Sequence, residues 1–205
     1  MGVMSSSAAT TSSHSLRGLL RQGVPGDELR SFLDELGPHA RVDEALSLGG
    51  REVGKLYRAC AGAPPVLPED FVPASMDDDR TVIFEGRNSL PTFSRFQKRF
   101  ARLGDEIVGY NHQTWGFVTG PGYFVVAPGS DREVVSGELY FDYTKTPRRA
   151  PTGWPKLQPN TSGLSLLVYA HMKDYMRSVA KNVVVGKAYK KDEAEGSFFL
   201  LCRAD

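Results

Sequence analysis

Apolar residues recur at helical spacing through the first third of the chain. Positions three and four apart share one face of an α-helix, so this spacing is typical of an amphipathic helix. It predicts helices over 16–20 and 27–36, the second followed by a Gly-Pro stop signal. A third helical pattern covers 42–61. Two consecutive glycines in its middle disfavour a continuous helix, so two short helices are the alternative there.

Two later segments show the same spacing. In the segment 91–103 the apolar face consists of Phe93, Phe96, Phe100 and Leu103. In the segment 164–183 the apolar stripe consists of Val168, Met172, Met176, Val179 and Val183. Both segments are therefore predicted to be helices. The face opposite the phenylalanines of the first is rich in arginine and lysine. We expect this face to be solvated, and docking on an anionic surface is the alternative.

Alternating polar and apolar residues, separated by turn signals, predict strands in the rest of the chain. The expected strands cover 81–85, 106–110, 115–119, 123–127, 133–143, 183–189 and 197–203. The sequence Gly-Pro-Gly at 120–122 suits a tight turn between two of them. The predicted fold class is therefore α+β, an antiparallel β-sheet with two packed helices, preceded by a small helical subdomain.

Composition divides the chain into four parts. We expect a disordered tail over 1–15, an acidic helical subdomain over 16–61, a linker rich in proline and aspartate over 62–80, and the α+β domain over 81–205. The first 80 residues have a net charge of −4 and the remaining residues one of +5. Opposite charges can attract within one chain or between two, so a protein partner or a homo-oligomer stays open.

The composition also excludes several classes of protein. The chain has 205 residues, of which 40% are hydrophobic and 24% charged, as in ordinary globular proteins. Its longest apolar run is much shorter than the roughly 20 residues of a membrane helix, and its N-terminus does not resemble a secretory signal. We therefore expect a soluble, cytoplasmic protein without a membrane partner, in which Cys60 and Cys202 are buried thiols. A formal net charge of +1 disfavours a nucleic acid partner.

The sequence lacks the motifs that announce common kinds of chemistry. It has no short-spaced histidine, cysteine or carboxylate ligands of the kind that hold a metal ion. It also has no Gly-x-Ser-x-Gly nucleophile motif and no phosphate-binding loop between a strand and a helix. We therefore expect neither a metal nor a cofactor.

Two of the four histidines are candidates for acid–base chemistry. His112 lies in a predicted turn, and His171 lies beside the apolar stripe of the predicted long helix. One face of the expected strand over 133–143 carries Glu138, Tyr140 and Asp142. Asp142 or Glu138 could then orient either imidazole, as acid–base catalysis near neutral pH requires. The ordinary alternative is a turn histidine beside a solvated strand face.

The segment 145–162 is the strongest candidate for a lid over a ligand. It contains four prolines, four basic residues and a tryptophan, and it is longer than most connections between elements. Trp154 favours a loop that packs on the protein. Together with Tyr140 and Tyr175, Trp154 is expected to line a pocket between the sheet and the long helix. An apolar or anionic small molecule is the expected ligand, and in an enzyme Tyr140 or Tyr175 would serve as the hydrogen-bond donor.

These observations favour a non-enzymatic binding or interaction protein with a small-molecule pocket. Two alternatives stay open. One is a small enzyme that uses the histidine and carboxylate pair described above. The second is a protein that assembles with copies of itself or on a larger scaffold.

Overall fold

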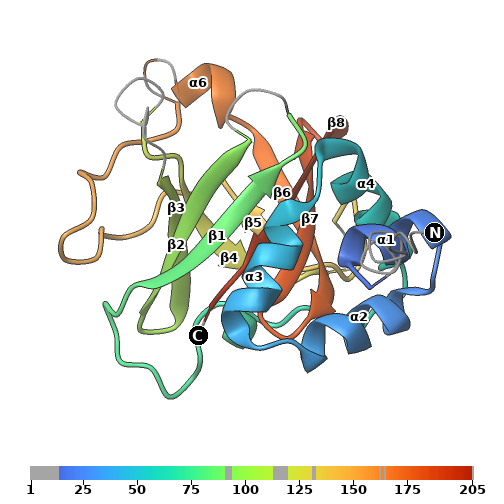
Figure 1. Cartoon of the computed structure of the whole chain (residues 1–205). Coiled ribbons are helices and arrows are strands. Elements are labelled where there is room, and N and C mark those ends of the chain that lie inside the picture. The colour runs from blue at the N-terminus through green and yellow to red at the C-terminus, as the bar shows by residue number, and fades with distance from the viewer. Residues whose placement is uncertain are drawn as a thin grey trace, which may run out of the picture.

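A computed structural model of the chain describes residues 14–90, 94–112, 120–130, 133–161, 163 and 165–204 (Figure 1). Two predictions fall wholly or mainly outside these residues. The strand expected over 115–119 is one, and the disordered tail, of which only the last two positions are described, is the other. Within the described ranges, no helix combines the length and the apolar character needed to cross a membrane.

Antiparallel strands form a closed barrel (Figure 1). Each strand pairs with the next one along the chain, and the last pairs with the first to close the ring. The strands are β1 (Val82–Asn88), β2 (Arg95–Leu103), β3 (Glu106–His112), β4 (Tyr123–Ala127), β5 (Tyr140–Asp142), β6 (Met172–Ala180), β7 (Val183–Lys190) and β8 (Glu193–Cys202). Closure pairs both edges of the sheet, which would otherwise be open to other chains.

The interior of the barrel is the main hydrophobic core. Alternate side chains of each strand point inward, and an eight-stranded barrel is just wide enough for them to fill its interior. Phe84, Phe100, Phe124 and Phe141 meet there, with ring centroids 4.7 to 5.5 Å apart in each contacting pair. Ring pairs at such distances stabilise the core beyond the burial of their area.

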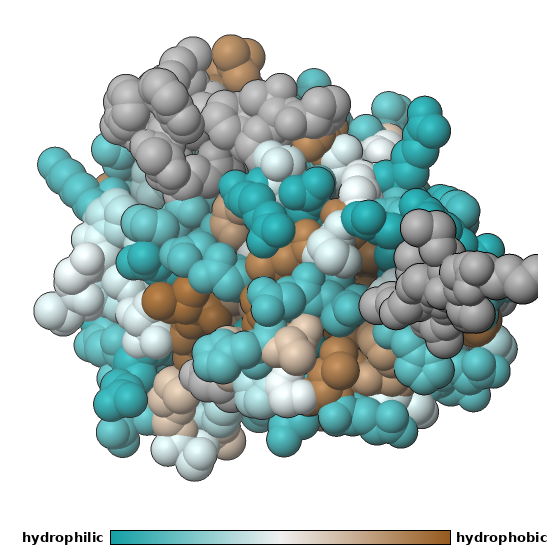
Figure 2. Space-filling view, viewed as in Figure 1, coloured by the Kyte–Doolittle hydropathy of each residue, from teal (hydrophilic) through white to brown (hydrophobic). Residues whose placement is uncertain are grey.

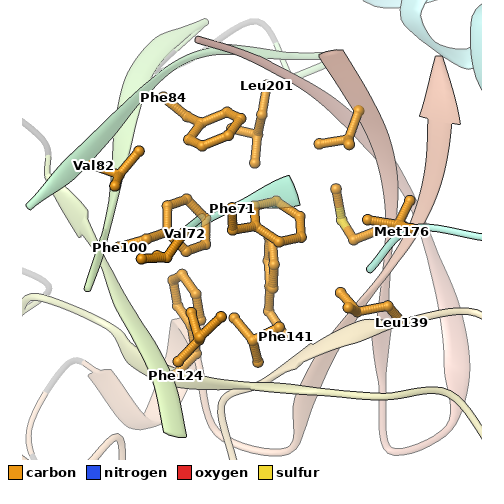
Figure 3. Close-up of a cluster of buried hydrophobic side chains, with 14 of the residues drawn as sticks. Phe71, Val72, Val82, Phe84, Phe100, Phe124, Leu139, Phe141, Met176 and Leu201 are labelled. Atoms are coloured by element: carbon orange, nitrogen blue, oxygen red, sulfur yellow. The ribbon is translucent and has the colours of Figure 1, made fainter. Parts of the chain in front are cut away.

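The segment before β1 closes one end of the barrel. Phe71, which follows the short 3-10 helix η1 (Pro68–Asp70), is fully buried. Its ring lies among three inward phenylalanines at centroid distances of 4.9 to 5.5 Å (Figure 3). Arg102 Nη2 donates a hydrogen bond of 2.7 Å to the carbonyl oxygen of Val72 and so holds this segment in place. We call this the lower end of the barrel, and the opposite end, near α6 (Ser165–Val168), the upper end.

Four N-terminal helices form a layer beside the barrel (Figure 1). They are α1 (Leu16–Gln22), α2 (Gly26–Glu35), α3 (Pro38–Ser47) and α4 (Gly50–Ala59). The last three lie on the outside of β6, β7 and β8, and the first packs against these three helices. Two helices therefore occupy the third predicted helical segment, with the break at the two glycines. Their apolar faces form one hydrophobic cluster with outward side chains of the barrel, namely Val179, Val183, Val185, Leu200 and Cys202. These strands are apolar on both faces because the helices cover their outer one.

The predicted α+β fold, a sheet with two packed helices and a separate helical subdomain, is wrong. The segment 91–103 contains β2, and the segment 164–183 contains only the short α6 before β6. The N-terminal helices share their core with the barrel and do not form a subdomain. The physical reason is that residues four apart share a face in a strand as well as in a helix. Such pairs face the barrel interior here: Phe96 and Phe100 in β2, and Met172 and Met176 in β6.

Candidate functional site

Four polar side chains lie together inside the upper half of the barrel. Lys98 comes from β2, Asn111 from β3 and Asp174 from β6, while Tyr143 directly follows β5. Each is buried, with an exposed fraction of 2 to 5%. Each lies an even number of positions from core residues of the same strand, so its side chain also points into the barrel. We call these four residues the Lys98 cluster.

The ammonium of Lys98 has three hydrogen-bond acceptors. Its Nζ donates to Asn111 Oδ1 at 2.8 Å, to Asp174 Oδ2 at 3.3 Å and to the hydroxyl of Tyr143. The Tyr143 hydroxyl in turn lies 3.2 Å from Asp174 Oδ2, to which it donates. Since an ammonium has three N–H groups, these partners satisfy it completely. The carboxylate of Asp174 lies within reach of both Lys98 and Tyr143.

Five aromatic rings surround this ammonium. Its Nζ lies 4.9 to 5.8 Å from the ring centroids of Phe96, Phe124, Phe141, Tyr143 and Phe199. The faces of aromatic rings attract a cation, so these rings offset part of the cost of burying a positive charge at this point. The same rings make the walls around the cluster apolar.

Burial dominates the pKa values of the cluster. It lowers the pKa of Lys98 and raises the pKa values of Asp174 and Tyr143, because each charged form loses its hydration. The attraction between Lys98 and Asp174 opposes the shifts of both. Whether their shared proton lies on nitrogen or on oxygen, the cluster has no net charge.

Tyr169, directly after α6, covers the cluster from the upper end. Its ring stacks on that of Tyr143, with centroids 5.5 Å apart and planes inclined by 7°. Gly122 has a φ of +57°, and a Cβ there would lie only 2.6 Å from the Tyr169 ring. Glycine at this position therefore lets Tyr169 lie over the cluster.

The short helix α6 is apolar on its exposed side. Leu166 and Leu167 expose 47% and 68% of their surface. Figure 2 shows apolar atoms at the top of the molecule, where α6 lies. The Lys190 ammonium donates a 2.7 Å hydrogen bond to the carbonyl oxygen of Leu167. The upper end thus presents apolar side chains to its surroundings on an element of a single turn.

The predicted catalytic residues lie outside this cluster. His112 is exposed at the end of β3, where its Nδ1 lies 3.4 Å from the Tyr110 hydroxyl. Partial burial and the nearby Arg99 lower the pKa of this histidine. His171 is exposed in the turn before β6, with a φ of +60°. Among the contacts of the described residues, neither imidazole meets Asp142, so their catalytic roles stay predictions.

Asp142 and Glu138 hold parts of the fold together. Asp142 accepts hydrogen bonds from the backbone N–H and the hydroxyl of Thr144, at 2.9 and 2.5 Å, and pairs with Lys145. Glu138 accepts a 2.6 Å hydrogen bond from Arg177 Nε and another from Tyr57 of α4. Glu138 therefore links the helical layer to β6.

Tyr140 and Tyr175 lie side by side, which a shared ligand site would require. Both lie on the outer face of the barrel, away from the Lys98 cluster. Their ring centroids are 5.3 Å apart, and both hydroxyls donate to the carboxylate of Glu133, at 3.1 and 2.8 Å. Lys173 Nζ also lies 2.7 Å from this carboxylate. The hydrogen bond from Lys173 is the main cause of the lowered pKa of Glu133. Burial raises the pKa of Tyr140 to about 12. The group fastens the loop before β5 to the barrel wall.

Trp154 packs on the barrel, as the sequence predicts for this loop. Its ring lies 4.7 Å from that of Tyr110 and 6.2 Å from that of Tyr123, and its Nε1 donates to the hydroxyl of Thr81 at 2.8 Å. Further along the loop, Asn160 Nδ2 donates to the carbonyl oxygens of residues 123 and 143, at 2.7 and 2.8 Å. These contacts fasten the described part of 145–162 to the strands β3 and β4. Its action as a lid stays a prediction.

Sequence reasoning missed the Lys98 cluster because a helical pattern places Lys98 and Asp174 on the polar faces of two helices. A signal was nevertheless present. Lys98 lies two positions from Phe96 and from Phe100, and Asp174 lies two positions from Met172 and from Met176. Read at the period of a strand, both charged residues fall on the apolar face.

No group of three or more histidine, cysteine or acidic residues in the described ranges could hold a metal ion. Comparisons of the chain with protein-family models, with curated proteins and with solved structures found no match. The Lys98 cluster is therefore the basis for assigning a function.

Proposed function

We propose that the protein binds a small, neutral, largely apolar molecule in the upper half of the barrel. The polar group of this molecule would lie against the Lys98 cluster. The observation that carries the proposal is the buried, charge-balanced group of Lys98, Asp174, Tyr143 and Asn111 inside an aromatic core.

Stability alone is a weak reason to keep such a cluster. Removing two charges from water costs several kcal/mol per ion, and replacing a buried ion pair by apolar residues is often neutral or stabilising. Buried groups with strongly shifted pKa values gather at functional sites. Polar groups that converge within an otherwise apolar interior are also typical of small-molecule sites.

The charge and the walls of the site limit the kind of ligand. The cluster has no net charge, so an added anion or cation would be buried without a counterion. A neutral carbonyl or hydroxyl group needs only to exchange hydrogen bonds with Lys98, Tyr143 or Asn111. The phenylalanine rings around Lys98 Nζ suit an aromatic or conjugated body.

The ligand would enter from the upper end. Phe71 fills the lower end and contacts the phenylalanines of the core. At the upper end, Tyr169 covers Tyr143 from a short segment after α6. Among the described residues, this ring and the single turn of α6 cover the upper end, and displacing them requires less rearrangement than opening the packed lower half.

Three probes with the same ring system test this proposal. We expect 2-naphthalenemethanol, which is neutral and polar at one end, to bind more tightly than naphthalene or 2-naphthoate, as measured by isothermal titration calorimetry. In the double variant Lys98→Met/Asp174→Asn, which keeps the net charge, the preference for the alcohol over naphthalene should fall about tenfold or more, because a hydrogen bond to a charged group is lost.

The matched control is Lys173→Met/Glu133→Gln, which removes an ion pair on the outer face of the barrel. It should leave the preference for the alcohol unchanged. Equal affinity of the unmodified protein for naphthalene and the alcohol would contradict the proposal.

An enzyme that uses a histidine and carboxylate pair, and a protein that assembles with copies of itself or on a scaffold, stay open as proposals. Neither is supported by a specific contact among the described residues.

A further inference from the structure

We propose that the ligand is an aldehyde or a ketone and that Lys98 binds it covalently as a protonated imine. This inference rests on the proposed function, because it names the chemical class of the molecule held at the Lys98 cluster. Its basis is the placement of Lys98 Nζ beside both a carboxylate and a phenol within an aromatic enclosure.

The two neighbours of the amine can perform the proton transfers that imine formation needs. Asp174 Oδ2 lies 3.3 Å from Nζ and can accept a proton from the ammonium, which frees the nitrogen lone pair. The Tyr143 hydroxyl contacts both Nζ and Asp174 Oδ2 and can pass a proton to an oxygen bound next to the nitrogen. Burial favours the first transfer because it lowers the pKa of Lys98 and raises that of Asp174.

The reaction balances without an oxidant or a reductant. Nζ of the neutral amine attacks the carbonyl carbon, and the oxygen takes the proton that Asp174 had accepted, delivered through Tyr143. Asp174 then removes a second proton from nitrogen and returns it, again through Tyr143, to the carbinolamine hydroxyl. The carbon–oxygen bond breaks, water leaves, and the nitrogen lone pair completes the double bond. One ammonium and one carbonyl compound have become one protonated imine and one water, with Asp174 again a carboxylate.

The product suits the site as well as the ammonium does. The protonated imine carries one positive charge at the position of Nζ, so Asp174 keeps its counterion and the five rings keep a cation within 4.9 to 5.8 Å. The net charge of the interior does not change. The apolar walls also limit the access of water, which would hydrolyse the imine.

Reductive trapping tests this inference. The intact protein is incubated with 2-naphthaldehyde and sodium cyanoborohydride, and the modified lysines are located by peptide mass spectrometry. We expect Lys98 to be modified before the exposed lysines such as Lys191. Tyr143→Phe should slow the labelling of Lys98 by about tenfold or more, as expected when a general acid is lost. The same change should leave the labelling of Lys191 unaffected.

The outcomes separate this inference from the proposed function. If 2-naphthalenemethanol, which cannot form an imine, binds at the cluster but Lys98 is not trapped by the aldehyde, the binding function stands and the imine is excluded. If neither probe engages the cluster, both proposals fail. Modification confined to exposed lysines, in a protein whose circular dichroism confirms that it is folded, also overturns the imine proposal.

Discussion

The proposed site depends on Lys98, whose buried ion pair affects both ligand binding and the stability of the fold. In the folded protein its charge is balanced by Asp174 at 3.3 Å, and its N–H groups are satisfied. Losing one partner of a buried pair is costly, whereas losing both can be nearly neutral. The contribution of the pair to folding can therefore be measured apart from its role in binding.

Lys98→Met alone should lower the free energy of unfolding by about 3 to 5 kcal/mol, because Asp174 is left buried without its counterion. The charge-balanced variant Lys98→Met/Asp174→Asn should recover most of that loss. Urea denaturation followed by fluorescence measures both values. A double variant less stable than either single variant would show that the pair serves mainly to stabilise the fold, and the proposed binding site would lose its main support.

At the scale of elements, a segment rich in proline acts as a plug of the barrel. Prolines over 62–80 prevent a long helix or strand, as the sequence predicts. Yet this chain segment places Phe71 at the centre of the core, where its ring contacts those of β1, β2 and β5 (Figure 3). The lower half of the barrel is therefore completed by a residue that belongs to no strand.

Phe71→Ala should destabilise the protein by about 3 to 5 kcal/mol, the usual loss when a buried phenylalanine leaves a cavity. Phe71→Leu, which keeps most of the apolar volume, should cost less than half as much. Thermal and urea unfolding measure these differences. The matched surface control is Leu67→Ala, since Leu67 lies four positions earlier in the same segment and is 54% exposed. If Phe71→Ala lowers the free energy of unfolding by less than about 1 kcal/mol, Phe71 does not help to close the barrel, because such a small loss is typical of exposed positions.

For the whole molecule, the decisive feature is that the helical layer and the barrel share one hydrophobic cluster. Helices α2 to α4 cover the outward residues of β6, β7 and β8, and α1 packs against these helices. Among the described residues, the two largest hydrophobic clusters therefore lie on either side of the barrel wall, one inside it and one between it and the helices. The charge difference between the two parts of the chain keeps self-association open as a prediction.

A chain lacking residues 1–61 should aggregate, because the outward face of Val183, Val185 and Leu200 would meet water as one apolar surface. Soluble yield and light scattering measure this outcome. A chain lacking only residues 1–13 is the matched control and should aggregate no more than the full-length chain under the same conditions. If the chain without the helices is soluble and folded, the barrel does not need the helical layer, and the shared hydrophobic cluster is not decisive.

Part of this structure could be predicted from the sequence alone. Apolar spacing with Gly and Pro signals located the N-terminal helices, and alternation located most strands outside 91–103 and 164–183. A spacing of four residues does not distinguish a helix from a strand, however, since positions 96 and 100 share a face in both. Hydrogen bonding to neighbouring strands resolved that ambiguity, and only ring closure of the sheet brought Lys98, Asn111, Tyr143 and Asp174 together. Contacts between residues 76 positions apart arise from tertiary structure, and local periodicity carries no information about them.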